Sequence, residues 1–193
     1  MRQETPPRPL WSRPAVALSF ALAVALVLAS AVLALQRSRA DRAHRTTGRA
    51  EWIWYSSRVP TPVPLRFYAV REIALAAAPA RATARVFVDR AHVLFVNGQR
   101  AGGATQRPGD GLAAYEVAQW LRPGVNRVVI EASSPTGIGG ILFALDLGGE
   151  SLVSDGRWRV DRDAAAMTGP GRYRPVVWGR PPMYPWGYPS DAR

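Results

Sequence analysis

The stretch from Ala15 to Leu35 constrains this chain most, because its twenty-one residues contain no charge, no Pro and no Gly. At about 1.5 Å per residue, a helix of this length spans roughly 30 Å, which matches the hydrocarbon core of a bilayer. Basic and polar residues flank the run on both sides. The sequence therefore predicts one transmembrane helix over residues 15–35, in contact with membrane lipid.

A cleaved signal peptide is the alternative interpretation of the same stretch. Ala29-Ser30-Ala31 fits an A-x-A cleavage pattern, and basic residues precede the apolar run. The run is longer than the roughly 7–15 apolar residues that signal peptides use, which favours a retained anchor.

The orientation of the helix is ambiguous from the flanking Arg residues. Three Arg precede it and five lie between residues 37 and 49, which by count alone places the following domain in the cytoplasm. Exported chains, however, begin with basic residues followed by an apolar run, and long domains cross largely regardless of charge. We expect a single-pass protein of the bacterial inner membrane with its domain on the periplasmic side.

The positive charge is concentrated beside the predicted helix. Of the formal net charge of +11, residues 1–49 contribute +6, from eight Arg and two acids, and the remainder contributes +5. This placement suits anionic headgroups, and no zinc-finger, RRM or basic-helix pattern accompanies it, so no nucleic-acid partner is expected. Residues 1–14 are interpreted as a basic, Pro-rich tail and residues 36–50 as a basic linker.

From residue 51 the sequence has the pattern of short strands. Apolar residues alternate with polar ones between Gly, Pro and Asn, and Asn97-Gly98 provides the two residues that a type I′ hairpin requires. Roughly seven to nine strands predict an all-β jelly-roll sandwich over residues 51–163. The expected strands cover residues 52–55, 65–75, 84–89, 93–96, 99–101, 126–132, 139–147, 151–154 and 157–160, with a short element at 115–121 and a closing hairpin through Asp155-Gly156.

Several motifs in this region resemble the galactose-binding-like jelly-roll modules that precede the catalytic domains of bacterial rhamnosidases and related glycoside hydrolases. They cover about residues 50–160 and include Ala50 to Trp54, Arg71-Glu72-Ile73, Ala84 to Asp89, Val96-Asn97-Gly98, Tyr115-Glu116-Val117, Leu121 to Asn126 and Ser154 to Trp158. The resemblance implies a sandwich that binds sugar, binds protein or packs against a neighbouring domain. In this sequence no catalytic domain follows the junction-like stretch 178–187, so we expect binding rather than catalysis.

No pattern predicts an enzyme, a cofactor or a metal site. The chain lacks Cys, and HExxH, EF-hand and phosphate-loop patterns are absent. His92 lies near Asp89, but a buried structural His and a turn-capping Asp account for them better than a catalytic triad does. Asp161 and Asp163 alternate with Arg and fit a solvated, ion-paired strand edge rather than a pair of catalytic carboxylates.

Two segments suit contacts with other proteins. Small side chains recur every four residues on one face of the predicted helix, at Ala17, Ala21, Ala25 and Ala29. Residues 164–193 form a tail rich in Pro and aromatic residues, whose candidate partner-binding residues are Trp178, Tyr184, Trp186 and Tyr188. Two alternatives stay open for this tail: it covers an edge of the sandwich, or it lies at the membrane interface.

These observations favour a non-catalytic accessory or scaffolding subunit that binds other subunits of a larger membrane complex, such as a respiratory or photosynthetic one. The alternative is a membrane-tethered carbohydrate-binding module with a glycan as its ligand. That alternative requires exposed aromatic rings beside hydrogen-bonding side chains on one face of the sandwich.

Overall fold

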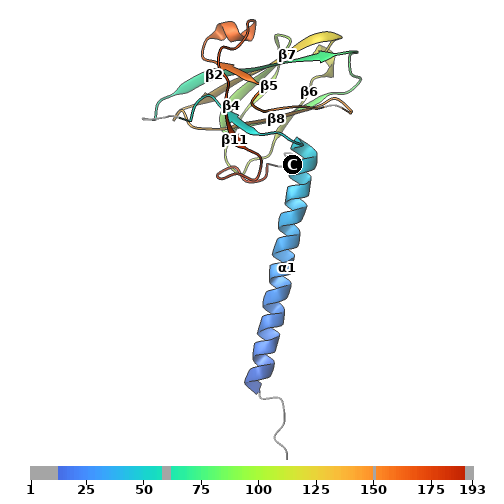
Figure 1. Ribbon diagram of the computed structural model, residues 1–193, viewed down its shortest axis with the longest axis vertical. Coiled ribbons are helices and arrows are strands. Elements are labelled where there is room, and N and C mark those ends of the chain that lie inside the picture. Colours follow the sequence, from blue (N-terminus) through green and yellow to red (C-terminus); the bar gives the residue numbers. More distant parts are fainter. Residues whose placement is uncertain (1–12, 58–61, 150, 190–193) are drawn as a thin grey trace, which may run out of the picture. The chain divides into compact units, whose positions relative to one another are not determined.

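The computed structural model describes residues 13–57, 62–149 and 151–189, and it divides after Arg39 into an N-terminal unit and a C-terminal β domain (Figure 1). Helix α1 runs over Arg13–Thr47. Its segment Val16–Ser38 has a mean hydropathy of 2.7 and is exposed throughout. By length and composition this segment can cross a membrane, although a signal sequence near an N-terminus has the same properties.

The helix is longer than the sequence predicts. It continues past Leu35 through most of the expected linker and ends at Thr47, where Gly48 adopts a φ of +57°. The stretch from 36 to 47 contains no Pro or Gly and is rich in Ala and Arg, which are good helix formers. Gly48 then provides the left-handed residue that commonly follows the last helical turn.

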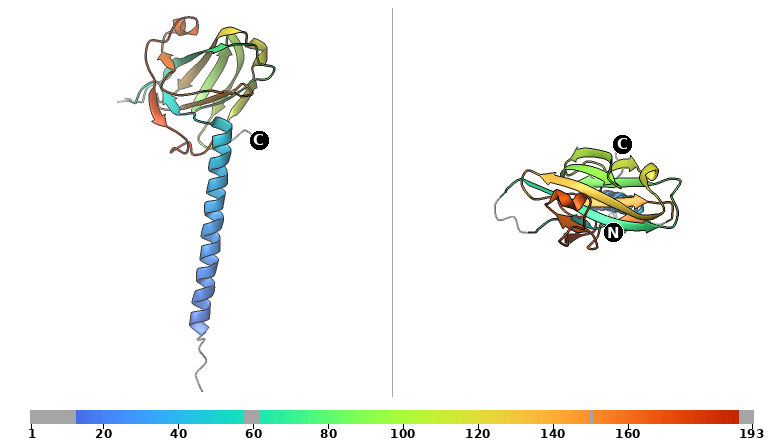
Figure 2. Two further views of the ribbon diagram at one scale, coloured as in Figure 1. Left: turned by 45° about the vertical axis from the view of Figure 1, so that its right-hand side comes forward. Right: turned by 90° about the horizontal axis from the view of Figure 1, so that it is seen from above.

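The β domain consists of two antiparallel sheets packed as layers (Figure 2). The first sheet has the order β11-β1-β8-β3-β6, with β9 also paired to β8, and the second has the order β10-β2-β7-β4-β5. The strands are β1 Trp52–Trp54, β2 Leu65–Leu75, β3 Thr83–Val88, β4 Arg90–Val96, β5 Gln99–Gln106, β6 Ala113–Glu116, β7 Gly124–Ser134, β8 Ile141–Asp146, β9 Ser151–Val153, β10 Arg159–Asp161 and β11 Val176–Gly179, with the short 3₁₀ helices η1 Ala118–Trp120 and η2 Ala164–Met167. The predicted all-β sandwich on a single N-terminal helix is confirmed.

The core lies between the two sheets and is built around aromatic side chains. Trp54 packs edge-to-face on Phe67 at 4.9 Å, and Phe143 packs on Trp158 at 5.2 Å. The two indoles of these pairs have acceptors: Trp54 Nε1 donates to the Gly137 carbonyl at 2.9 Å, and Trp158 Nε1 donates to a carbonyl of β9 at 2.8 Å. Trp54 and Trp158 are therefore buried with their N–H groups paired, so they stabilise the sandwich through both packing and hydrogen bonding.

One hairpin is confirmed and another is wrong. Asn97 and Gly98 have φ values of +50° and +80° and join β4 to β5, as predicted. The Asp155-Gly156 turn, in contrast, does not close a hairpin, because β9 pairs with β8 in the first sheet while β10 pairs with β2 in the second. The turn carries the chain from one sheet to the other.

The C-terminal segment is part of the sandwich. Strand β11 pairs with β1 at the edge of the first sheet, and Trp186 is only 8% exposed. The expectation that Trp186 is presented to a partner is therefore corrected, and the alternative in which the tail covers an edge of the sandwich holds for this residue. The physical reason is that an indole stacked on another ring removes more apolar surface from water than an exposed one does.

Candidate functional site

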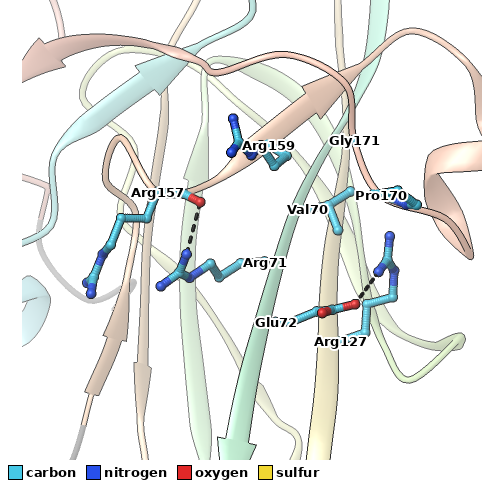
Figure 3. Close-up of a pocket in the computed structure, with 8 residues that line it drawn as sticks. All are labelled: Val70, Arg71, Glu72, Arg127, Arg157, Arg159, Pro170 and Gly171. Carbon is cyan, nitrogen blue, oxygen red and sulfur yellow. Dashed lines mark hydrogen bonds and ion pairs between the residues drawn. The ribbon is translucent and has the colours of Figure 1, made fainter.

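A step at the edge of the second sheet creates the candidate site. Strand β10 is short: Arg159 pairs with Val70, and β2 continues to Leu75 without a β10 residue beside it. The segment that follows η2 passes close to the start of β10 and borders this gap. A Cβ added to Gly171 would lie only 2.8 Å from the Cβ of Arg159. The result is a recess of about 270 Å³ (Figure 3), lined by Val70, Arg71, Glu72, Arg127, Arg157, Arg159, Pro170 and Gly171.

One Arg of this recess is already fully bonded. Arg127 Nη1 lies 2.6 Å from a carboxylate oxygen of Glu72, and the same guanidinium donates to the carbonyl groups of Ala166, Met167 and Gly169. These bonds hold the segment after η2 against β7. Arg127 therefore has a structural role, and its charge compensates that of Glu72.

A second Arg is paired at the rim. Arg157 Nη2 lies 2.6 Å from Oδ2 of Asp155, and this hydrogen-bonded partner raises the pKa of the Arg157 side chain. The side chain is 67% exposed, so the pair contributes little to stability.

The remaining two guanidinium groups have donors that no protein group uses. Arg71 Nη1 donates to the carbonyl of Arg157 at 2.9 Å, but its buried Nε has no partner among the described residues. Arg159 is exposed, and within the described part of the chain no carboxylate pairs with it. Figure 3 shows both groups on the side of the recess away from the Glu72–Arg127 ion pair. The recess thus presents the positive charges of Arg71 and Arg159, and the exposed Arg159 supplies N–H donors.

The strand next to the recess is held by a second ion pair. Arg172 binds Asp161 with two hydrogen bonds of 2.7 Å, and these bonds, before any other cause, hold the pKa of the Asp161 carboxyl far below its usual range. Asp161 is 2% exposed. The predicted ion-paired edge is therefore present, but the expectation that Asp161 is solvated is wrong, because its carboxylate faces backbone N–H groups and Arg172 rather than water.

The aromatic residues predicted for partner binding have different environments. Trp186 stacks on Trp52 with ring centroids 4.5 Å apart and donates to Oδ2 of Asp89 at 2.9 Å. Tyr184 is 95% exposed and Trp178 is 36% exposed, whereas Tyr188 is half-buried. The tail residues therefore do not form one exposed docking surface.

The helix residues predicted for partner binding, Ala17, Ala21, Ala25 and Ala29, are all exposed on α1. In a single chain an exposed face is compatible with contact to lipid or to another helix. Their role in helix packing stays a prediction.

His92 and Asp89 do not form a catalytic pair. His92 is 4% exposed, its Nε2 lies 3.1 Å from the hydroxyl oxygen of Tyr115, and burial lowers its pKa to about 4. Asp89 instead accepts the Trp186 hydrogen bond. Across residues 13–57, 62–149 and 151–189, no three His, Asp or Glu side chains gather where they could hold a metal ion.

Motifs and local patterns in the sequence do not identify the arginines of the recess. One signal was available: Arg71 occupies the same alternating positions of β2 as Phe67 and Ala69, which are buried in the core. A charged residue in the inward-facing register of a strand needs a partner or access to a ligand. Arg159 offered no such signal, since its approach to Val70 depends on the pairing of distant strands.

Comparison with solved structures gives the fold a context. A lectin from Pleurotus ostreatus, solved in complex with GalNAc, superposes with a TM-score of 0.63 at 22% identity, covering 75% of this chain and 46% of the lectin. An α-L-rhamnosidase of Streptomyces avermitilis complexed with L-rhamnose gives 0.64 at 19% identity, covering 74% and 16%. A GH78 rhamnosidase of Bacillus sp. GL1 gives 0.63 at 21%, covering 74% and 19%.

These matches confirm the predicted resemblance to rhamnosidase modules as a likeness of fold. The chain spans less than half the length of each of these proteins. No protein-family model and no curated protein sequence matches it. The domain is a β-sandwich, and this fold is what the chain has in common with a lectin and with part of two rhamnosidases.

Proposed function

We propose that the β domain is a carbohydrate-binding module tethered to a membrane by α1. The observation that carries this proposal is the fold match, over three-quarters of the chain, to a lectin that was solved with GalNAc. A rhamnosidase solved with L-rhamnose matches over nearly the same share. Proteins of two kinds that act on or bind sugars thus contain this sandwich.

The edge of the second sheet has the features that a sugar site needs. The recess of about 270 Å³ lies just below the range of roughly 300–1,000 Å³ that small-molecule sites occupy. Its free guanidinium donors can bond sugar hydroxyl groups. Tyr173, whose backbone is bonded to Val160 of β10, keeps its side chain 52% exposed two residues after Gly171. Tyr173 does not line the recess, but it gives the same edge of the second sheet an exposed ring, which the carbohydrate interpretation requires.

The helix accounts for location rather than binding. Val16–Ser38 exposes Leu, Val and Phe side chains along its whole length, and such an apolar surface is stable only when lipid or protein covers it. With α1 in the bacterial inner membrane, the sandwich would meet glycans on the periplasmic side.

The accessory-subunit interpretation has less support. It relied on the aromatic tail as a docking surface, and one of the two Trp residues proposed for docking, Trp186, is buried within the domain. The Ala row of α1 remains compatible with a neighbouring helix, but a small-residue row alone does not identify a partner.

The test is binding of the full chain to an immobilised glycan panel. The protein is held in a polyoxyethylene detergent, because detergents with sugar headgroups would compete for the site. We expect retention by a subset of glycans, competition by the free sugar, and weaker retention of Tyr173→Ala. If the folded protein is retained by no glycan and instead co-purifies with a fixed set of membrane proteins, the carbohydrate proposal is wrong.

A further inference from the structure

We propose that the recess at the edge of β2 and β10 binds the acidic group of an anionic saccharide, such as the carboxylate of a uronic acid, through Arg71 and Arg159. This inference rests on the carbohydrate-binding function proposed above and names the class of ligand.

The charge of the recess is the first argument. Its eight lining residues include four Arg and a single carboxylate, that of Glu72. Counting Asp155, which pairs with Arg157, the local balance is still +2. Glu72 is bonded to Arg127 and Asp155 to Arg157, so the two uncompensated charges are those of Arg71 and Arg159. A neutral sugar would leave both charges unpaired, whereas a carboxylate would supply one counter-charge and lower the local balance from +2 to +1.

The hydrogen bonding of Arg71 is the second argument. Its Nε is buried and has no partner among the described residues, and buried donors without a partner are rare in folded proteins. The bond from Nη1 to the Arg157 carbonyl, 2.9 Å long, restricts the orientation of the guanidinium plane. A planar fork held in one orientation suits the two oxygens of a carboxylate, since less side-chain freedom is lost on binding.

The shape of the recess is the third argument. Val70, which is 4% exposed, forms its floor, and Pro170 and Gly171 line it without polar side chains. Arg159 shares the outer face of the sheet with Val70, its partner in the register, and Arg71 starts from the inward face of β2, so the two Arg side chains approach the recess from the two faces of the sheet edge (Figure 3). At about 270 Å³, the recess is larger than the space that a carboxylate alone fills. The space fits a sugar ring whose acidic group points toward the two Arg side chains.

The experiment compares matched sugars on the full chain in polyoxyethylene detergent, by calorimetry or ligand-observed NMR. The panel contains glucuronic, galacturonic and mannuronic acids, their uncharged methyl esters and the three parent hexoses. Inorganic phosphate and sulfate are included to detect a simple anion site. We expect at least one acid to bind ten times more tightly than its methyl ester and to weaken as salt is added.

Variants assign the effect to the recess. Arg159→Gln and Arg71→Gln should each weaken binding of that acid about tenfold and leave binding of the parent hexose nearly unchanged. Arg71→Lys keeps the charge but removes the fork, so it should also lose affinity. Arg81→Gln removes an equal charge from an exposed position before β3 in the other sheet and should have no effect. Arg159 is exposed, so its variant remains informative even if Arg71→Gln fails to fold.

The outcomes separate this inference from the function on which it rests. If acids and methyl esters bind equally, or if the recess variants bind the acid as the wild type does, the acidic-ligand inference is wrong while carbohydrate binding stands. If phosphate or sulfate binds as tightly as every acid, the recess is a simple anion site and the inference is overturned. If no sugar of any kind binds the folded chain, the proposed function fails together with the inference.

Discussion

A single indole ties the end of the described chain to its first strand. Trp186 stacks on Trp52 and donates to Asp89, whose second carboxylate oxygen has no hydrogen-bond partner in the described structure. Trp186→Ala should lower the free energy of unfolding by about 3–5 kcal/mol, because a buried ring is replaced by a cavity. Trp186→Phe keeps the stacking but loses the hydrogen bond to Asp89, and should cost about 2 kcal/mol. Chemical denaturation of the full chain measures both.

Tyr184 is the matched control for this prediction. It lies two residues from Trp186 in the same turn but is 95% exposed. Tyr184→Ala should change the free energy of unfolding by less than about 0.5 kcal/mol. Equal effects of the Trp186 and Tyr184 substitutions would contradict the burial described here.

His92 gives the domain a defined response to acid. Burial lowers its pKa from an ordinary value of 6.5 to about 4, so between these values the unfolded chain binds a proton that the folded chain does not. Protonation of the unfolded chain therefore favours unfolding as the pH falls. The stability that depends on neutral His92 is fully present above pH 6.5 and is lost by about pH 4. A shift of this size corresponds to roughly 3 kcal/mol.

His92→Gln isolates this contribution, since Gln can still bond Tyr115 but does not titrate. The stability difference between wild type and variant should shrink by about 3 kcal/mol from pH 6.5 to pH 4, whereas the carboxylates that titrate in the same range cancel in the comparison. Unfolding curves at several pH values measure it. A difference that is constant over this range would show that His92 is accessible to protons in the folded state.

The environments of some side chains can be predicted from the sequence, and those of others cannot. His92 was expected to be a buried structural residue, and it is. The sequence predicts that the aromatic tail binds a partner. Trp186 faces inward instead, because it stacks on Trp52, and this contact cannot be predicted from the sequence of the tail. Recognition of Arg71 and Arg159 as neighbours requires the pairing of β10 with β2, and a pairing between residues almost ninety positions apart is not encoded in local periodicity.

Gly140, directly before β8, allows the C-terminal segment to pack closely on the first sheet. A Cβ on Gly140 would lie 2.9 Å from the Trp52 ring and 3.0 Å from the Trp186 ring. Gly140→Ala should therefore displace the Trp186 ring and loosen the segment after β11. We expect chymotrypsin to cleave after Trp186 about ten times faster in the variant, since local opening exposes the site.

Gly149→Ala is the control for proteolysis, because no atom lies within 4 Å of the added Cβ. It should be cleaved after Trp186 at the wild-type rate. Unchanged cleavage of Gly140→Ala would mean that the two rings accommodate a methyl group without opening the segment.

The positions of most elements could be predicted, and their partners could not. Alternation and turn residues locate β2, β4, β7 and β8, and Asn-Gly specifies the β4–β5 turn. The sequence pattern of residues 151–160 fits a hairpin as well as it fits two strands in different sheets. In the structure, the Ser154 hydroxyl bonds the backbone of Glu51 and Phe143 and so fixes the end of β9 to the first sheet. Trp158 then inserts between the sheets, which directs the chain to the second one.

At the scale of the whole molecule, retention of α1 decides whether the domain is anchored. We expect the mature protein to begin at its encoded N-terminus and to remain in the membrane fraction after alkaline carbonate washing, because a 23-residue span of mean hydropathy 2.7 partitions stably into lipid. N-terminal sequencing and fractionation measure this. A mature chain that begins at Val32 and is released as a soluble protein would contradict it.

The pairing of β1 with β11 also has a consequence for how the protein is made. Trp52 and its β11 partner Gly179 are 127 positions apart, so the ribosome synthesises most of the domain, including the other β1 partner β8, before β11 exists. Until then the Trp52–Trp54 edge is unpaired and apolar, a state in which strands aggregate. We therefore expect this edge of the first sheet to close only after β11 has been synthesised, with a chaperone shielding β1 in the nascent chain until then.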